Sequence, residues 1–348
     1  MILVARHFVL SCWWQTSLFA SWRSIILFVI LVLSGCSNKP EILNISGSKM
    51  GTTYQITVIA DQLPPEDLEQ QIEQLLSKVD NSMSTYKKDS EISQFNRLSA
   101  GKTMTISQEF AEVVKISQKV WQLSNGAFDP TIGPLVDLWG FGPGERHESI
   151  PSSKIIALTK AKIGFDSVVL KEQTLSKTKA VELDLSAVAK GYAVDRVADL
   201  LEMLALPDYL VEIGGEIRVS GLNADSVAWR IAVEQPQLFA EVDRVLSITD
   251  IAVATSGDYR NYFEKDGVRY SHTINPNTGM PVNHNLASVT VFAGSCAEAD
   301  AWATAFSVIG AEQSLELADK HNLAAYMLVR ENGQFVPKLS ANFGLLID

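Results

Sequence analysis

The chain of 348 residues is 47% hydrophobic and 20% charged, and its formal net charge is −11. This composition is typical of a globular protein with a sizeable core, and it excludes a largely disordered chain. The acidic balance and the lack of a basic cluster exclude a nucleic-acid-binding surface, because phosphate recognition needs clustered Lys and Arg side chains.

The N-terminus has the pattern of a bacterial export signal. Arg23 precedes an apolar run over 25–33, which is too short to span a bilayer as a stop-transfer helix. The sequence Leu33-Ser-Gly-Cys36 follows and closely resembles a lipobox, in which the cysteine is lipidated and becomes the new N-terminus. The alternative is an uncleaved anchor that ends by chance in Gly-Cys.

We therefore expect a lipoprotein signal peptide over 1–35, a lipidated Cys36 with a short tether over 36–41, and one catalytic domain over 42–348. Such a protein would be anchored to a bacterial membrane without spanning it and would face the periplasm. Ser37 directly after the cysteine leaves sorting to the outer membrane open.

Cysteine usage agrees with this expectation. Cys12 would leave with the signal peptide and Cys36 would carry lipid, so Cys296 would be the single thiol of the mature chain. A lone cysteine forms no intramolecular disulfide, and the sequence therefore predicts no disulfide framework.

Predicted strands and helices alternate along the mature chain without a strict βαβ rhythm. Strands are predicted over 42–45, 54–59, 168–170, 181–183, 209–213, 217–219, 229–233, 245–248, 251–255, 287–292 and 324–329. Helices are predicted over 64–79, 90–98, 108–124, 152–161, 187–204, 296–309 and 311–321. This mixture predicts an α+β fold, with mixed sheets and packed helices in a single catalytic domain.

Two stretches are too rich in Gly and Pro for regular structure. Residues 126–134 hold two of each, and residues 139–144 form a Gly-rich loop. The loop does not follow a strand and lacks the spacing of a dinucleotide-binding fingerprint, and the sequence contains no Walker A motif. Rossmann and P-loop nucleotide sites are therefore excluded.

The stretch 182–195 is predicted to be the end of a buried strand that continues directly into a helix. Ser186 is expected to cap the helix, with Asp184 just before its start and Lys190 one turn inside it. Free amides, a hydroxyl and a Lys at a helix N-terminus suit an anionic ligand such as a pyrophosphate. An ordinary capped amphipathic helix would look the same, so this stretch alone leaves both interpretations open.

Asp300 and Thr304 are four residues apart on a predicted helix and therefore lie on one face of it. A carboxylate and a hydroxyl in this arrangement can supply two hard oxygen ligands to Mg²⁺. Taken alone, the same spacing is also common in helix caps and on solvated helix faces.

Eight motifs occur in order along the chain. They are Met50-Gly-Thr-Thr-Tyr54, Met83-Ser-Thr-Tyr86, Gly126-Ala-Phe-Asp-Pro-Thr131, Asp184-Leu-Ser-Ala-Val-Ala-Lys-Gly191, Val211-Glu-Ile-Gly-Gly215, Ala254-Thr-Ser-Gly257, Ser271-His-Thr-Ile-Asn-Pro276 and Ala299-Asp300 to Thr304. Together they resemble the FAD:protein FMN transferase family, also called the ApbE family of periplasmic flavin transferases. The resemblance extends from about Met50 to the C-terminus and implies the ApbE-like fold and a place at the inner membrane.

The resemblance also implies a reaction. The FMN half of FAD would be transferred to a Thr or Ser hydroxyl of an acceptor protein, AMP would be released, and Mg²⁺ would be required. The implied partners are FAD and an exported redox subunit that carries a Thr/Ser flavinylation motif, together with the membrane through the lipid anchor.

Family roles can be assigned to matching residues. FAD would contact Met50, Tyr86, Ala127, Phe128, Asp129, Asp184, Lys190 and Ile274. The metal would be held by the backbone carbonyl of Ala187 and by the side chains of Asp300 and Thr304. Some members carry a further Asp directly before the Thr, where this chain has Ala303, which predicts additional water ligands.

The chemistry of the reaction suggests two catalytic residues. Lys190 would stabilise charge on the transferring phosphoryl group, and His272 would accept the hydroxyl proton because imidazole titrates near neutral pH. His272 could instead be a structural anchor that only positions the substrate. Arg260 could bind phosphate or the acceptor, or could form a plain salt bridge.

Two other functions use the same features. A Mg²⁺-dependent FAD pyrophosphatase would release FMN and AMP, with water in place of the acceptor hydroxyl. A non-catalytic periplasmic lipoprotein would only bind and deliver flavin. The Asp300/Thr304 pair and His272 favour catalysis, since a binding protein needs neither.

Overall fold

The structure is a computed structural model that describes residues 40–142, 147–236, 242–257 and 261–347. The predicted signal peptide, Cys36 and Arg260 lie outside these residues. Contacts group the chain from Glu41 onward into one compact unit. Within the described ranges, no helix has both the length and the apolar character needed to cross a membrane.

An antiparallel sheet, eight-stranded within the described residues, forms the centre of the fold, in the order β1-β2-β6-β7-β10-β15-β16-β17. Its strands are β1 (Glu41–Lys49), β2 (Thr52–Ala60), β6 (Asp208–Ile213), β7 (Glu216–Ser220), β10 (Ile251–Gly257), β15 (Leu286–Ala293), β16 (Ala324–Glu331) and β17 (Gln334–Leu339). Together with the helices described next, this sheet confirms the predicted α+β fold class.

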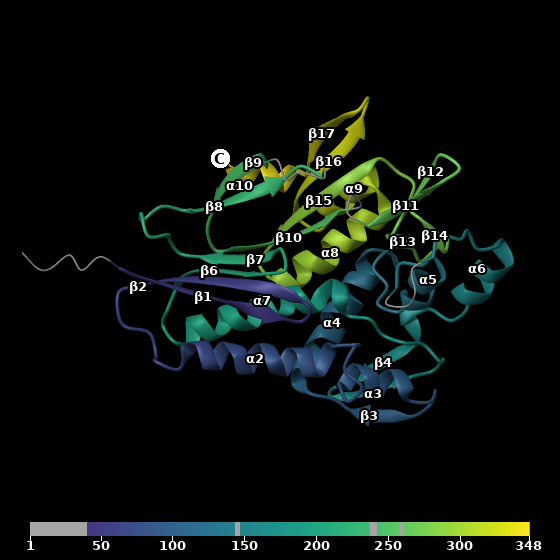
Figure 1. Cartoon of the computed structure of the whole chain (residues 1–348), viewed down its shortest axis with the longest axis horizontal. Helices are drawn as coiled ribbons and strands as arrows, with labels where there is room; N and C mark the ends of the chain where they lie inside the picture. Colours follow the sequence, from purple (N-terminus) through teal and green to yellow (C-terminus); the bar gives the residue numbers. More distant parts are fainter. Residues whose placement is uncertain (1–39, 143–146, 237–241, 258–260, 348) are drawn as a thin grey trace, which may run out of the picture. The chain divides into compact units, whose positions relative to one another are not determined.

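The sheet is covered on both faces. Figure 1 shows helices on one side of it and the hairpin of β8 (Trp229–Glu234) and β9 (Val242–Ile248) with α10 (Ala341–Ile347) on the other. The helices of the first side are α2 (Leu68–Met83), α4 (Gln108–Leu123), α7 (Ser186–Met203), α8 (Cys296–Ile309) and α9 (Ala311–Lys320). Alternation along β6 shows why two layers form: Tyr209 and Val211 join the helical core, whereas Leu210 packs on the hairpin side.

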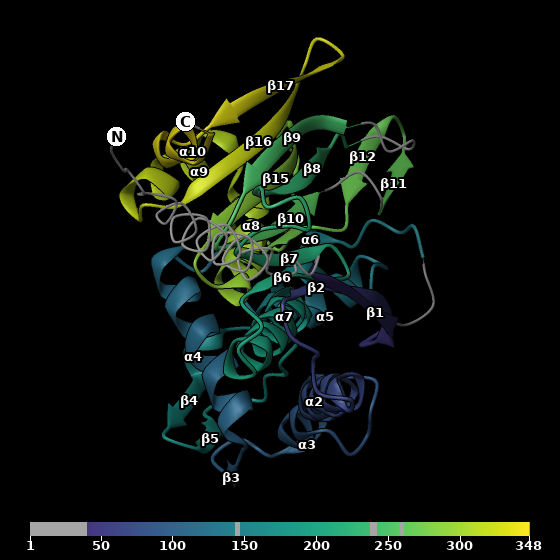
Figure 2. The same ribbon diagram turned by 90° about the vertical axis from the view of Figure 1, so that its left-hand side faces the viewer.

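Smaller elements extend the two ends of this unit. Figure 2 shows a three-stranded sheet below α4, on the side away from β16 and β17. It consists of β3 (Thr103–Thr105), β5 (Thr174–Lys177) and β4 (Val168–Lys171), next to α3 (Glu91–Arg97). A third apolar cluster holds α5 (Gly133–Leu138), α6 (Ser153–Lys160) and the hairpins β11–β12 (Tyr262–Lys265, Val268–Ser271) and β13–β14 (Ile274–Asn275, Met280–Pro281).

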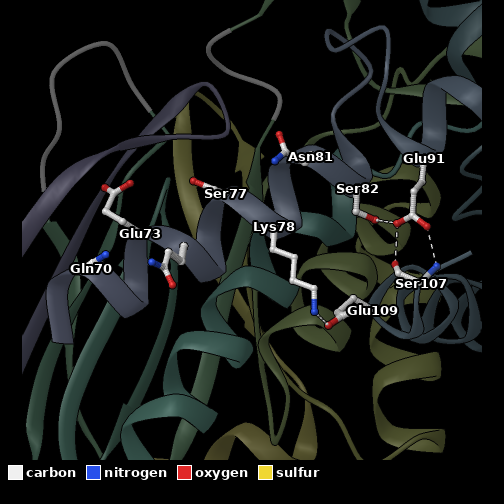
Figure 3. A pocket seen from close by; sticks show the side chains of 10 residues that line it. Gln70, Glu73, Ser77, Lys78, Asn81, Ser82, Glu91, Ser107 and Glu109 are labelled. Carbon is white, nitrogen blue, oxygen red and sulfur yellow. Dashed lines mark hydrogen bonds and ion pairs between the residues drawn. The ribbon is translucent and has the colours of Figure 1, made fainter. Parts of the chain in front are cut away.

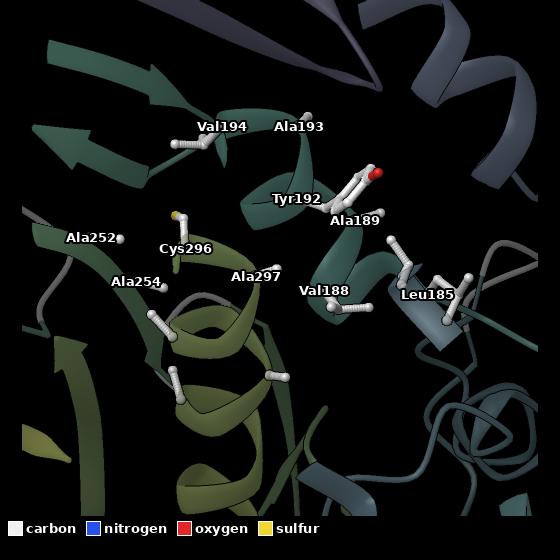
Figure 4. Close-up of a cluster of buried hydrophobic side chains, with 14 of the residues drawn as sticks. Leu185, Val188, Ala189, Tyr192, Ala193, Val194, Ala252, Ala254, Cys296 and Ala297 are labelled. Atoms are coloured by element: carbon white, nitrogen blue, oxygen red, sulfur yellow. The ribbon is translucent and has the colours of Figure 1, made fainter. Parts of the chain in front are cut away.

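Helices α7 and α8 cross at very close range. A Cβ atom on Gly191 would lie 2.3 Å from the Cys296 carbonyl oxygen, so this position requires glycine. Figure 4 shows several alanines around the crossing, among them Ala189, Ala193 and Ala297. The close approach brings Lys190 on α7 next to the helix that carries Asp300.

The prediction of a strand over Val181–Leu183 is wrong. Side chains from neighbouring segments bind the backbone groups that a strand partner would bind. The Asn96 side-chain amide accepts from Leu183 N at 2.7 Å and donates to Leu183 O at 2.9 Å, and Lys177 Nζ donates to Val181 O at 2.7 Å. The period-two pattern instead reflects alternate burial, since Val181 and Leu183 are buried.

The prediction that Ser186 caps α7 is also wrong. The helix includes Ser186, and the residue before it, Leu185, has no capping side-chain bond. The cap comes from one residue further back, where Asp184 Oδ1 accepts from Ser186 N at 2.9 Å. Asp and Ser compete for the same role at helix starts, and here the longer reach of the carboxylate binds the free amide.

Candidate active site

Ten of the predicted site residues line one cavity of about 550 Å³, which we call the central cavity. They are Ala127, Phe128, Asp129, Asp184, Ala187, Lys190, His272, Ile274, Asp300 and Thr304. These residues come from four separate segments of the chain, and the fold brings all four to one place.

Met50 and Tyr86 lie elsewhere, in a side cavity of about 430 Å³. Its wall shares Asp184 and Lys190 with the central cavity, so the two cavities adjoin at the start of α7. Met50 has the left-handed φ of 56° at the β1–β2 turn, and Tyr86 is 83% exposed. An exposed aromatic ring beside a polar corner is available to pack on a planar ligand.

The first turn of α7 is irregular at Ala187, whose φ and ψ of −89° and 17° are not helical. In a regular helix the Gly191 N–H would bond the Ala187 carbonyl. Here that N–H donates to Asp300 Oδ2 at 3.3 Å. The predicted metal-binding carbonyl therefore belongs to a kink in the cavity wall.

Lys190 is held between two carboxylates at the base of the central cavity. Its Nζ lies 3.1 Å from Glu216 Oε1 and 3.7 Å from Asp300 Oδ2. Both acids are buried, whereas Lys190 is partly exposed to the cavity. The three side chains come from β7, α7 and α8, so this cluster joins the sheet to both helices.

Burial and mutual charge shift the proton affinities of this cluster. Burial raises the pKa of Glu216 to about 8, and the nearby Asp300 charge adds to that rise. Burial likewise raises the pKa of Asp300, although Lys190 opposes the change. Burial alone would lower the pKa of Lys190, but the charges of Asp300 and Glu216 raise it well above its usual range. The ammonium therefore stays protonated at neutral pH.

Thr304 lies one turn beyond Asp300 on the same face of α8, as the spacing predicts. Its hydroxyl is 3.5 Å from the Ser256 hydroxyl at the end of β10. Asp300, Thr304, Ser256 and Ala187 thus line the same cavity, and carboxylate, hydroxyl and carbonyl oxygens are all hard donors.

The loop 126–134 is tied to the start of α7. Asp184 N donates to Pro130 O at 2.7 Å, and Asp129 Oδ1 accepts from the Thr131 amide and hydroxyl at 2.7 and 2.6 Å. Burial raises the pKa of Asp129 despite these two hydrogen bonds. Its own polar groups therefore order this loop. The prediction that 126–134 lacks regular structure is wrong at its end, because Gly133 and Pro134 begin α5 and Pro is favourable in a first helical turn.

His272 follows β12 and lines the central cavity. Its Nδ1 lies 3.0 Å from the Asn261 carbonyl oxygen. A carbonyl only accepts, so Nδ1 must carry the proton, and in the neutral ring Nε2 is then the nitrogen able to take up another. The Phe141 ring, 6.4 Å away edge-on, packs beside the imidazole.

The residues present fit a divalent cation. Four carboxylates line the described part of the central cavity (Asp129, Asp184, Glu216 and Asp300) against the single ammonium of Lys190. An anionic pyrophosphate would be repelled by this balance unless a cation accompanied it. Across the described residues no group of three or more His, Cys, Asp or Glu could hold a metal by itself, so hydroxyl, carbonyl, water and substrate oxygens would have to contribute.

Sequence reasoning missed Glu216 and Ser256 as lining residues. Glu216 had a usable signal. It begins β7 directly after the Gly214-Gly215 turn, and strand alternation places it with Arg218 on the side that faces the helices. A carboxylate on the buried face of a strand needs a partner, which marks the position as functional or structural.

Another cavity, of about 650 Å³, lies elsewhere, along α2. Figure 3 shows two sets of paired polar side chains in it, around Glu91 and between Lys78 and Glu109. Glu91 accepts from Ser82 and from the Ser107 amide and hydroxyl, each at 2.6 Å, and Lys78 binds Glu109. It contains none of the predicted site residues.

Comparison with known proteins agrees with this geometry. The model of the ApbE family matches residues 50–327. The chain belongs to the ApbE family. A Vibrio cholerae protein named FAD:protein FMN transferase is 42% identical to this ApbE-family chain over 323 residues, which are 92% of this chain and 97% of the relative.

Two further members support the same assignment. A Haemophilus influenzae protein, also named FAD:protein FMN transferase, is 41% identical over 93% of this chain and 97% of its own length. The solved structure of the flavin transferase ApbE from Vibrio cholerae is 40% identical, with a TM-score of 0.82 over 88% of this chain and 99% of that structure. The ApbE-like fold expected from the sequence is thereby confirmed.

Proposed function

We propose that this ApbE-family chain is a Mg²⁺-dependent FAD:protein FMN transferase. It would transfer the FMN moiety of FAD to a Thr or Ser hydroxyl of an exported acceptor protein and release AMP. Relatives with this name span nearly the whole chain. The acceptor would be a redox subunit that carries a Thr/Ser flavinylation motif.

The observation that carries the proposal is the meeting of His272, Lys190 and the Asp300/Thr304 pair in one cavity. A phosphoryl transfer to a hydroxyl needs a proton acceptor and positive charge around the pyrophosphate. A protein that only stores flavin needs no proton acceptor beside hard oxygen donors. The side cavity with Met50 and Tyr86 offers room for the flavin ring, and FAD contacts would extend over Ala127, Phe128, Asp129, Asp184 and Ile274.

In this reaction the acceptor hydroxyl oxygen attacks the phosphorus of the FMN phosphate. A new P–O bond forms, the P–O bond to the AMP phosphate breaks, and AMP leaves with the electron pair. His272 Nε2 takes up the hydroxyl proton, while Lys190 stabilises charge on the phosphoryl oxygens. Asp300, Thr304 and the Ala187 carbonyl would hold Mg²⁺, which supplies charge neutralisation at the pyrophosphate when bound.

We further propose that the protein acts outside the cytoplasm, anchored through lipid on Cys36 to a bacterial membrane and facing the periplasm. The lipobox-like Leu33-Ser-Gly-Cys36 supports this location. An exported acceptor would meet the enzyme there, and the family favours the inner membrane.

A transfer assay tests the activity. Protein from Ser37 onward is incubated with FAD, Mg²⁺ and an exported redox subunit bearing Asp-x-x-Ser/Thr-Gly/Ala-x-Thr. In-gel flavin fluorescence on the acceptor is the expected result, and it should disappear when the acceptor Thr is changed to Ala. Free FMN and AMP with an unlabelled acceptor would identify a pyrophosphatase instead, and FAD left intact would identify a binding protein.

A further inference from the structure

One oxygen of the buried Glu216 carboxylate has no hydrogen-bond partner among the residues that the structure describes. Oε1 lies 3.1 Å from Lys190 Nζ, whereas Oε2 is shielded from solvent and unpaired. The residue is 4% exposed and lines the central cavity. A buried carboxylate oxygen without a donor or a cation is unfavourable for folding. Its presence therefore calls for an explanation beyond packing.

Lys190 alone does not balance the charge at this place. Its ammonium is shared between Glu216 and Asp300, whose Oδ2 is 3.7 Å away. Ionisation of all three groups would leave one negative charge in excess in a region largely withdrawn from water, and either a proton on Glu216 or a bound cation would offset it. Unpaired charge is poorly tolerated there, because water no longer solvates it and screens it only weakly.

The surrounding cavity wall offers oxygen ligands for a metal cation in addition to the Lys190 ammonium. β7, which carries Glu216, packs against α8, which carries Asp300 and Thr304. The Thr304 hydroxyl lies 3.5 Å from the Ser256 hydroxyl, and both residues line the central cavity together with Glu216. Carboxylate and hydroxyl oxygens are the ligands that hard divalent cations prefer.

We propose that Glu216 is a second carboxylate ligand of the divalent cation, binding it through Oε2 from β7 while Asp300 and Thr304 bind it from α8. The inference rests on the proposed function, because it adds a residue to the cation site of that reaction. The competing explanation is that Glu216 only holds Lys190 in place. The two explanations differ in what happens to cation affinity when Glu216 loses its charge.

Mn²⁺ titration of the flavin-free protein, followed by the EPR signal of free Mn²⁺, distinguishes them. Glu216→Gln should weaken Mn²⁺ binding by about 10-fold or more, and Asp300→Asn should do the same. Glu212→Gln is the matched control. Glu212 lies on the other side of the same turn, where its Oε1 accepts from Gly215 N at 2.6 Å, and it does not line the central cavity. Its Mn²⁺ affinity should stay within about twofold of the wild type.

Lys190→Met provides the second discriminating variant. If Glu216 binds the cation directly, removing the competing ammonium should preserve or tighten Mn²⁺ binding. Wild-type affinity in Glu216→Gln would overturn the proposal, as would a loss in Lys190→Met equal to that in Glu216→Gln. Should Glu216→Gln fail to fold by circular dichroism, Glu216→Asp replaces it. That variant keeps the charge but withdraws the oxygens, so its affinity should fall between those of wild type and Asp300→Asn, and wild-type affinity would again overturn the proposal.

The titration contains neither flavin nor acceptor, so its outcome is separate from that of the transfer assay. Glu216-dependent Mn²⁺ binding without FMN transfer would leave the inference standing and remove the proposed function. FMN transfer together with unchanged Mn²⁺ affinity in Glu216→Gln would support the proposed function and overturn the inference about Glu216.

Discussion

The carboxylate of Asp195 on α7 caps the N-terminus of α8 at Cys296. Asp195 Oδ1 accepts from Cys296 N at 2.9 Å, and Oδ2 accepts from Ala297 N at 2.9 Å and from the Ser295 hydroxyl at 2.8 Å. Arg218 on β7 binds the same carboxylate at 3.1 Å. One side chain thus fixes the start of the helix that carries Asp300 and Thr304.

Removing this cap should destabilise the whole protein. Asp195→Ala leaves two backbone amides and the Arg218 guanidinium without their buried partner, and we expect a loss of about 3 kcal/mol in the free energy of unfolding. Urea denaturation followed by circular dichroism measures it. Asp199→Ala is the control, since Asp199 contacts Arg218 only at 3.6 Å and caps no helix, and it should cost less than about 1 kcal/mol. Equal losses in the two variants would contradict the capping role.

Gly191→Ala should separate α7 from α8. The new methyl group would meet the Cys296 backbone, which cannot move aside as a side chain could, so we expect a loss of about 2 kcal/mol in unfolding free energy. Gly294→Ala is the matched control, because no atom lies within 4 Å of its Cβ position. A melting temperature for Gly191→Ala equal to that of Gly294→Ala would show that the crossing tolerates more space than the structure indicates.

His272→Ala should abolish transfer and leave FAD binding intact. Loss of a general base typically lowers kcat by about 10²-fold or more, whereas contacts to FAD from the remaining walls are unchanged. Single-turnover transfer and equilibrium FAD binding by fluorescence separate the two effects. If His272 only anchors its loop, FAD affinity should fall together with the rate, and a near-normal rate would remove His272 from the reaction.

Stability should decrease on mild acidification because of His321. Burial lowers the pKa of this imidazole below its ordinary 6.5, and the charges of Lys320 and Lys119 lower it further. The unfolded chain therefore binds the proton more tightly than the folded protein, so the free energy of unfolding falls as pH drops from about 6.5 through the folded-state pKa. Above that window the group has no effect.

Denaturation at pH 7.5 and at pH 5.5, values of about one unit on either side of 6.5, measures this dependence. His321→Gln should show a smaller loss between the two conditions than the wild type. His147→Gln, a change at an exposed imidazole, should retain the wild-type loss. An undiminished loss in His321→Gln would assign the pH dependence to other groups.

Cys36→Ala should release the protein from membranes. Without the thiol no lipid can be attached at this position, so the protein should move from the membrane fraction to the soluble periplasmic fraction or remain uncleaved. Fractionation with labelling by a fatty-acid analogue distinguishes these outcomes. Labelled, membrane-bound protein in the Cys36→Ala variant would contradict lipidation at Cys36.

Local sequence signals predicted the fold class and most elements of this protein because the patterns are strong. Ser107 precedes an apolar periodicity and caps α4, where its hydroxyl accepts from Phe110 N at 3.2 Å. Asn125 and Gly126, a residue pair typical of helix C-termini, follow the same helix and both adopt positive φ values, of 53° and 78°. Such features depend on neighbours within a few residues, and the sequence contains all of them.

What the sequence could not supply depends on distant partners. Asn96 binds the backbone at Leu183 from 87 residues away, and this bond replaces a sheet ladder that local alternation would suggest. The pairing of Glu216 with Lys190 likewise joins strand β7 to helix α7, and the whole of β6 lies between these two elements in the sequence. Strand alternation marks Glu216 as a buried acid, but no local pattern identifies its partner or that of Leu183, so both pairings became visible only in the fold.

The tight α7–α8 crossing has a consequence for how the substrate specificity of this enzyme could evolve. The groups proposed for charge stabilisation and cation binding sit on two helices whose spacing is fixed by Gly191 against Cys296 and by the Asp195 cap, so their mutual geometry has almost no room to drift. The segments 126–134 and 271–276 line the same cavity, and neither belongs to α7 or α8. Directed evolution toward other flavins or other acceptor proteins should therefore succeed through randomised loops and fail through randomised helix residues.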